Sequence, residues 1–192
     1  MFHAVSLRKT WPLWSAFALL VLATVIQLHR QGRVAWCACK QPALWNGDIW
    51  SAHNSQHLLD PYSFTHALHG VLFCGLLWLI LPRMRLVWRL WYATGLEALW
   101  EILENSPWII DRYRAVTISL GYTGDSIANS LGDLACCALG FLLAWKLGAR
   151  RSLILFVVTE LLLLCWIRDT LILNVIMLIH PIEAIKTWQM GS

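Results

Sequence analysis

Five long stretches of mostly apolar residues constrain this chain more than any other feature of its sequence. They cover about residues 11–28, 64–81, 86–103, 127–147 and 152–168. A helix needs roughly 17–25 predominantly apolar residues to cross the hydrocarbon core of a bilayer, and each stretch has that length. Hydrophobic residues make up 58% of the chain and charged residues 14%, whereas soluble domains average about 45–50% and about 25%. We therefore exclude a soluble fold and expect an all-α, polytopic membrane helix bundle of about five transmembrane spans, with residues 1–192 forming a single integral membrane domain.

The segments outside these stretches set the expected topology. Residues 29–63 form a long outer loop, and residues 169–190 contain an apolar run that is too short to cross alone. We expect this C-terminal segment to lie at the membrane interface or to re-enter the membrane, with a break at Pro181. Lys and Arg favour the cytoplasmic side of short loops. In a five-span arrangement, three basic groups share one side, which places the N-terminus in the cytoplasm: Arg8 and Lys9; Arg83, Arg85 and Arg89; Lys146, Arg150 and Arg151.

Ionisable side chains gather in the outer half of three neighbouring spans. His66 and His69 are three residues apart near the start of the second span, so they share one helix face. The third span ends, and the fourth begins, with further polar residues at spacings of three and four: Glu97, Glu101, Glu104 and Asn105, then Asp125, Asn129 and Asp133. A charge at membrane depth costs about 2.5–3.5 kcal/mol on insertion scales, which makes each such residue a functional hypothesis.

This mixture of imidazoles and carboxylates suits a divalent metal such as Zn, Mn or Fe. We expect the metal ligands to be His66, His69, Glu101 and Asp133. A bound ion lowers the pKa of its water towards neutrality and makes a nucleophile, with Glu97, Glu101 and Asp125 as the candidate acid/base residues. The alternative is structural, because an intramembrane polar residue often makes an interhelical hydrogen bond worth roughly 1 kcal/mol.

Two arginines in the connection after the third span suggest an anionic ligand. Arg112 and Arg114 lie on the side of the acidic cluster, and arginine binds phosphate or carboxylate with two parallel hydrogen bonds. With Asn105 and Asn129 they form the expected substrate-binding set. They could equally be ordinary interfacial arginines, one of them paired with Asp111.

The outer loop contains a second group of candidate metal ligands. Cys37 and Cys39 are followed by His53 and His57, in an order loosely similar to a Cys2His2 zinc site, although zinc sites usually have two to four residues between the cysteines. A disulfide in an oxidising compartment and two free thiols are the alternatives.

Several short motifs together resemble a known family. They are Trp36-Cys37-x-Cys39, Asn54-Ser55-Gln56-His57, Tyr62-Ser63-Phe64-x-His66-x2-His69-Gly70 and Gly121-Tyr122-x-Gly124-Asp125-Ser126-x2-Asn129-Ser130. In these motifs the chain resembles a domain-of-unknown-function family of uncharacterised bacterial inner-membrane proteins. The resemblance spans residues 32–189 and implies a multi-pass inner-membrane protein without supplying a reaction. More distantly, the chain is similar to VanZ-like membrane proteins.

Two functions follow as hypotheses. The first is a metal-dependent membrane enzyme, a hydrolase or transferase, that acts on a lipid or lipid-linked anionic substrate at the periplasmic face. The second is a non-catalytic binding or assembly protein that uses the same cluster to hold a metal, cofactor, lipid or partner. No nucleic-acid partner is expected, because the net charge of +4 is spread over loops. The sequence leaves the oligomeric state open.

Overall fold

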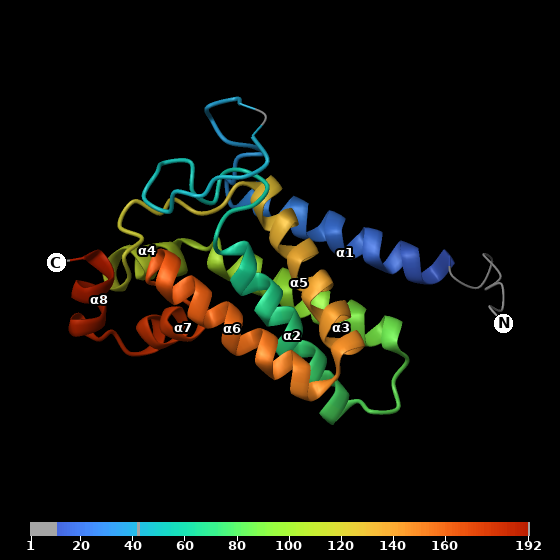
Figure 1. Ribbon diagram of the computed structural model, residues 1–192. Coiled ribbons are helices and arrows are strands. Elements are labelled where there is room, and N and C mark those ends of the chain that lie inside the picture. Colours follow the sequence, from blue (N-terminus) through green and yellow to red (C-terminus); the bar gives the residue numbers. More distant parts are fainter. Residues whose placement is uncertain (1–10, 42, 192) are drawn as a thin grey trace.

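The computed structural model describes residues 11–41 and 43–191, and within them the chain forms eight helices and no strand (Figure 1). The helices are α1 (Trp11–Arg30), α2 (Ser63–Ile80), α3 (Leu86–Glu104), α4 (Pro107–Val116), α5 (Ile127–Leu147), α6 (Ala149–Ile167), α7 (Leu171–Ile179) and α8 (Glu183–Met190). The predicted all-α fold is confirmed. Arg8 and Lys9, on which the expected orientation partly depends, lie outside the described residues.

Three helices, α1, α2 and α5, are long and apolar enough to cross a membrane, and this composition marks the chain as a membrane protein. A fourth candidate span is the pair α6 and α7, which bends by 75° at a short break. Helix α3 has 19 residues but carries Arg89, Glu97 and Glu101. Length and composition thus support three to four spans, whereas five were expected. The expected span 86–103 contains three charged residues, and α6 qualifies as a span only together with α7.

Helices α2 and α5 form the most extensive helix pair in the bundle. Both begin at the same end of the molecule and run side by side (Figure 1). A Cβ atom at Gly70 would collide with the main-chain oxygen of Cys137, and one at Gly140 would collide with that of Ala67. The absence of a side chain at these two positions is therefore what allows the two backbones to approach closely.

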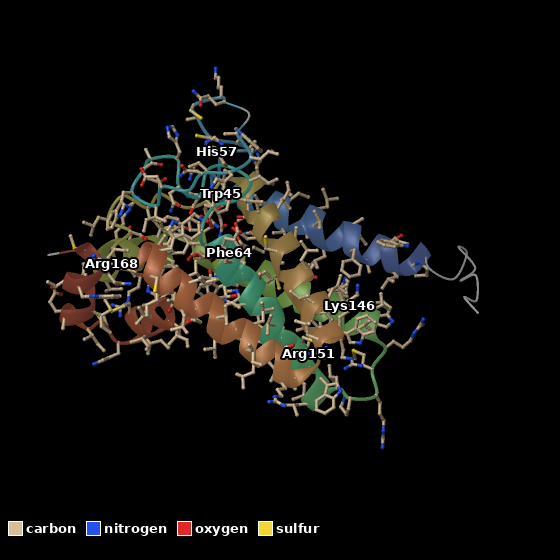
Figure 2. The ribbon with its side chains drawn as sticks, in the orientation of Figure 1. Trp45, His57, Phe64, Lys146, Arg151 and Arg168 are labelled. Atoms are coloured by element: carbon tan, nitrogen blue, oxygen red, sulfur yellow. The ribbon has the colours of Figure 1, made fainter. Side chains whose placement is uncertain are left out.

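The three helices α2, α3 and α5 each have an apolar half and a polar half. Leu77, Ala93 and Phe141 form a buried apolar cluster at one end. At the other end lie the first turns of α2 and α5 and the last turns of α3, which carry the ionisable residues. Lys146 and Arg151 lie at the apolar end (Figure 2). The basic residues around the α2–α3 and α5–α6 connections therefore share one end, as predicted.

Helix α6 faces outwards along most of its length, and its single carboxylate has a structural role. Leu153 and Leu162 are more than 60% exposed, as expected for side chains that contact lipid. Glu160, by contrast, is buried and accepts hydrogen bonds from the backbone N–H groups of Leu171 (3.0 Å) and Ile172 (3.2 Å). It thereby caps the first turn of α7. The predicted break at Pro181 is confirmed, since this residue lies between α7 and α8.

Helix α4 is the element that the sequence did not predict. The residues after α3 were expected to form a connection, but Ser106 caps a helix there by accepting a hydrogen bond from the N–H of Ile109, with Pro107 in its first turn. At the end of the α4–α5 connection, the side chain of Ser126 caps α5 by accepting a hydrogen bond from the backbone N–H of Asn129.

Replacing Gly140 by alanine should destabilise the bundle by about 1–3 kcal/mol, the usual cost of overpacking, because α2 and α5 must separate. Thermal unfolding of the detergent-purified protein, followed by tryptophan fluorescence, measures this loss. Gly75→Ala is the matched control, because a Cβ at Gly75 meets nothing within 4 Å. Equal melting temperatures for the two variants would show that the close helix contact does not contribute to stability.

Candidate functional site

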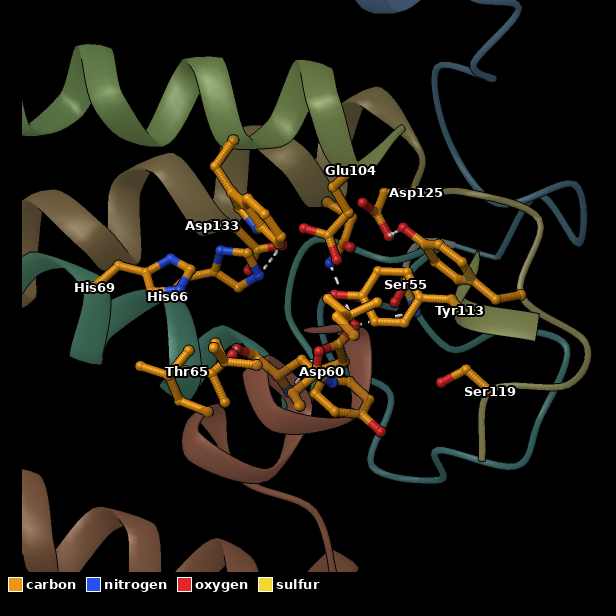
Figure 3. A pocket seen from close by; sticks show the side chains of 18 of the residues that line it. Ser55, Asp60, Thr65, His66, His69, Glu104, Tyr113, Ser119, Asp125 and Asp133 are labelled. Carbon is orange, nitrogen blue, oxygen red and sulfur yellow. Dashed lines mark hydrogen bonds and ion pairs between the residues drawn. The ribbon is translucent and has the colours of Figure 1, made fainter. Parts of the chain in front are cut away.

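A cavity of about 250 Å³ lies at the polar end of the bundle (Figure 3). Helices α2, α3, α4, α5 and α7 contribute to its wall, together with the loop between α1 and α2 (residues 31–62, the α1–α2 loop). One side is polar and includes His66, His69, Glu104, Asp125 and Asp133. Apolar residues also line the cavity: Phe73 and Trp100, which lie against His69, and Leu171, Val175 and Leu178 of α7.

His66 is at the centre of the polar side. Its Nδ1 atom lies 2.5 Å from Oε1 of Glu97 and 3.3 Å from Oε1 of Glu101, while its Nε2 atom lies 3.9 Å from Oδ2 of Asp133. Nδ1 of His69 lies 3.0 Å from Oε2 of Glu97. Glu97 is fully buried and contacts both imidazoles. These two contacts fix the orientation of both rings.

The carboxylate of Glu101 has an ion-pair contact with His66 but accepts no hydrogen bond. Glu101 is 0% exposed, and neither of its oxygens accepts a hydrogen bond. Oε2 of Glu104 is also buried without a hydrogen-bond partner. A buried carboxylate without donors is strongly disfavoured unless it binds a proton or a cation. The ligand atoms of His66, Glu101 and Glu104 lie within 4.8 Å of one another, close enough to share one ion.

The surroundings of this cluster favour a cation. Asp60, Glu97, Asp125 and Asp133 are all buried around it. Among the cavity-lining residues in the described part of the chain there is no Lys or Arg. Carboxylates therefore outnumber the two imidazoles, and the site attracts positive charge.

Two further carboxylates are held by donors at the edge of the cavity. Asp125 accepts hydrogen bonds from Nδ2 of Asn105 (2.8 Å) and from the hydroxyl of Tyr122 (2.9 Å). Burial nevertheless raises its pKa to about 6, although both donors act in the opposite direction. Asp60 accepts from the backbone N–H of Ser55 (3.0 Å), and burial raises the pKa of its carboxyl as well.

The structure brings most of the predicted metal and acid/base residues together, in a different grouping from the one expected. Glu97, expected as an acid/base group, forms a metal-capable set with His66 and His69. Glu104, which was noted in the acidic stripe but not chosen as a ligand, forms a second set with His66 and Glu101. Asp133 lines the cavity and accepts a hydrogen bond from the hydroxyl of Ser63 (2.8 Å).

The predicted substrate-binding residues are only partly brought together. Asn129 lines the cavity, and Asn105 supports Asp125 beside it. Neither arginine lines the cavity, since Nε of Arg112 donates to the carbonyl of Leu178 (3.0 Å) and Nε of Arg114 to that of Tyr122 (2.5 Å). Arg114 also lies 3.5 Å from Asp111. Both arginines thus fasten main-chain segments near the site.

Several cavity residues were not predicted as site residues at all. They are Asp60, Tyr62, Tyr113, Tyr122 and Asn174. Asp60 and Tyr62 directly precede the helix that carries His66, so their proximity to it was a usable signal. Tyr113 and Asn174 belong to the short helices α4 and α7, whose position the sequence pattern does not give.

The cysteines and histidines of the α1–α2 loop also converge. Sγ of Cys37 lies 3.2 Å from Nδ1 of His53, and Sγ of Cys39 lies 3.8 Å from Nε2 of His57. Both cysteines are free thiols. This Cys/His cluster lies in the loop at the top of Figure 2, where His57 is labelled.

Comparison with known proteins identifies the family of this chain, and the family names state no activity. Residues 28–191 match the family model described as "Protein of unknown function (DUF2585)". The chain is 46% identical over 182 residues to a UPF0314 protein of Paracoccus denitrificans, covering 95% of this chain and 94% of that one. It is 47% identical over 184 residues to a UPF0314 protein of Brucella anthropi, covering 95% and 93%. No solved structure matches. The chain therefore belongs to the DUF2585 family and to the UPF0314 proteins.

Proposed function

We propose that this protein is a metal-dependent membrane enzyme that hydrolyses a lipid or lipid-linked substrate. The observation that carries the proposal is the carboxylate of Glu101, which is fully buried, accepts no hydrogen bond and lies beside His66 and Glu104. A divalent cation would satisfy these oxygens and offset the surplus of carboxylates around them.

His66, Glu101 and Glu104 would hold the ion, and Glu97 would orient His66. A carboxylate that accepts a hydrogen bond from a ligating histidine fixes the tautomer and position of the ring. Glu97 is placed to do this for His66. The metal would supply an activated water. Asp125 lies at the cavity wall with a pKa near 6, which suits a general base at neutral pH.

The mixed lining of the cavity suits a substrate with an apolar part. Leu171, Val175 and Leu178 of α7 line the same cavity as His66 and Asp133. At about 250 Å³ the cavity accommodates a reacting headgroup linkage, while the chains of a lipid would extend beyond it. Since no arginine of residues 11–41 and 43–191 lines the wall, a negative charge on the substrate would be offset by the metal rather than by Arg112 or Arg114.

The proposed location is the bacterial inner membrane, with the N-terminus in the cytoplasm and the cavity towards the periplasm. The distribution of charge supports it: the basic α2–α3 and α5–α6 connections lie at the end opposite the cavity, and positively charged connections favour the cytoplasmic side.

Glu101→Gln is expected to remove one equivalent of bound metal, because the amide replaces the negative ligand oxygens. Metal content is measured by mass spectrometry on protein purified without chelator and loaded in turn with Zn²⁺, Mn²⁺ or Fe²⁺. Glu160→Gln is the matched control, since Glu160 is another buried helix carboxylate, but its oxygens already accept backbone hydrogen bonds. Metal binding that is unchanged in Glu101→Gln would refute the metal site.

Asp125→Asn is expected to lower turnover by about 10²–10⁴-fold, the usual contribution of a general base, while the metal stays bound. Turnover by wild type should also fall as the pH drops below about 6, because protonated Asp125 accepts no proton. The assay uses metal-loaded protein in liposomes of total bacterial polar lipids, with products identified by mass spectrometry.

Asp111→Asn, a change at an exposed carboxylate, serves as the control for this variant. Full activity of Asp125→Asn would remove this residue from the mechanism. Metal-loaded wild type that releases no product would instead favour a binding or assembly role for the same cavity.

A further inference from the structure

The α1–α2 loop has little apolar core of its own to hold its shape. In its described residues it contains turns and one isolated β-bridge, between Trp45 and Leu59, but no helix or strand. Large apolar side chains point outwards, with Leu44 62% and Trp50 59% exposed. A segment of this kind needs a disulfide, a metal or an external contact to adopt one conformation.

Four potential ligands from this loop meet at one point. The ligand atoms of Cys37, Cys39, His53 and His57 all lie within 4.8 Å of one another. A tetrahedral zinc ion with bonds of about 2.3 Å to sulfur and about 2.0–2.1 Å to nitrogen separates a sulfur from a nitrogen by about 3.6 Å. The two sulfur–nitrogen distances of 3.2 Å and 3.8 Å lie on either side of that value.

The two cysteines contact the two histidines as well as each other. Each thiol is free and contacts a different histidine, Cys37 with His53 and Cys39 with His57. Cys37 and His57 are also buried, at 4% and 5% exposure. Cys39 is half-buried and His53 is exposed. Two thiols and two imidazoles that converge on one point, without an apolar core around them, are typical of a structural metal site.

The segment between the two histidines forms part of the cavity wall. Asn54 and Ser55 line the cavity. Ser55 donates its backbone N–H to Asp60 and accepts at its carbonyl from the N–H of Ser126 (2.9 Å), next to the start of α5. The side chain of Gln56 donates to the carbonyl of Gly124 (2.8 Å). Fixing His53 and His57 therefore fixes the residues that close this side of the cavity.

We infer that Cys37, Cys39, His53 and His57 bind a structural zinc ion that holds the α1–α2 loop against the cavity. All four ligands come from the protein, which leaves no open position for a substrate or an activated water. The role is therefore mechanical. It is separate from the proposed catalytic metal and does not depend on it.

The test uses the full-length protein purified in detergent without chelator. We expect one equivalent of zinc that is lost in Cys37→Ser/Cys39→Ser and retained in Glu101→Gln. The control is Cys74→Ser/Cys165→Ser, which removes two thiols from helices α2 and α6. Replacing zinc by Co²⁺ should produce the absorption bands of a tetrahedral cobalt–thiolate centre in wild type and in both Glu101→Gln and the control.

His53→Gln provides a variant that preserves folding if the double cysteine variant does not, because His53 is exposed and packs little. It should weaken zinc binding and speed tryptic cleavage after Arg33 and Lys40 in the loop. A Cys37–Cys39 disulfide in the purified wild type would overturn the inference. So would cobalt that binds without thiolate bands, or zinc content unchanged in Cys37→Ser/Cys39→Ser.

Discussion

The cost of keeping carboxylates away from water governs the polar end of this bundle. Asp60, Glu97, Glu101, Asp125 and Asp133 are all buried in one region. Most are compensated locally: Glu97 by two imidazoles, Asp125 by an amide and a phenol, and Asp133 by a serine hydroxyl. Glu101 and Glu104 differ from these residues: neither oxygen of Glu101 accepts a hydrogen bond, although one lies 3.3 Å from Nδ1 of His66, and Oε2 of Glu104 has no hydrogen-bond partner either. Buried polar atoms without a hydrogen-bond partner are rare in native structures, and these oxygens are therefore the ones on which the proposed cation site depends.

The same three helices build the apolar half and the polar half of the bundle. The apolar cluster around Phe141 holds α2, α3 and α5 together at one end, and the close contact at Gly70 and Gly140 keeps α2 against α5 between the two ends. The polar side chains at the other end therefore belong to helices whose positions are set by the apolar cluster and by the glycine contacts. Rigid supports of this kind hold ligating and proton-accepting groups in fixed mutual positions.

The sequence predicted the elements with a strong periodic or apolar signal and missed those whose position depends on tertiary contacts. Helix α5 was expected at 127–147 and is observed as Ile127–Leu147. The spacing of His66 and His69, and of Glu97 and Glu101, correctly placed these residues on facing surfaces, because helical periodicity is a local property. Helix α4 contains Asp111, Arg112 and Arg114 within ten residues, so neither hydropathy nor length marked it as a helix. The hydrogen bonds of the two arginines to main-chain carbonyls arise only when distant segments meet.

The break between α6 and α7 connects one wall of the cavity to a helix that faces outwards. Glu160 of α6 holds the first N–H groups of α7, and α7 in turn supplies Leu171, Val175 and Leu178 to the apolar lining of the cavity. A tilt of α6 is therefore transmitted through two hydrogen bonds to the surface that a substrate would touch. Helix tilt responds to the thickness of the surrounding bilayer. A change in lipid composition that altered the tilt of α6 would therefore also move the α7 residues that line the cavity.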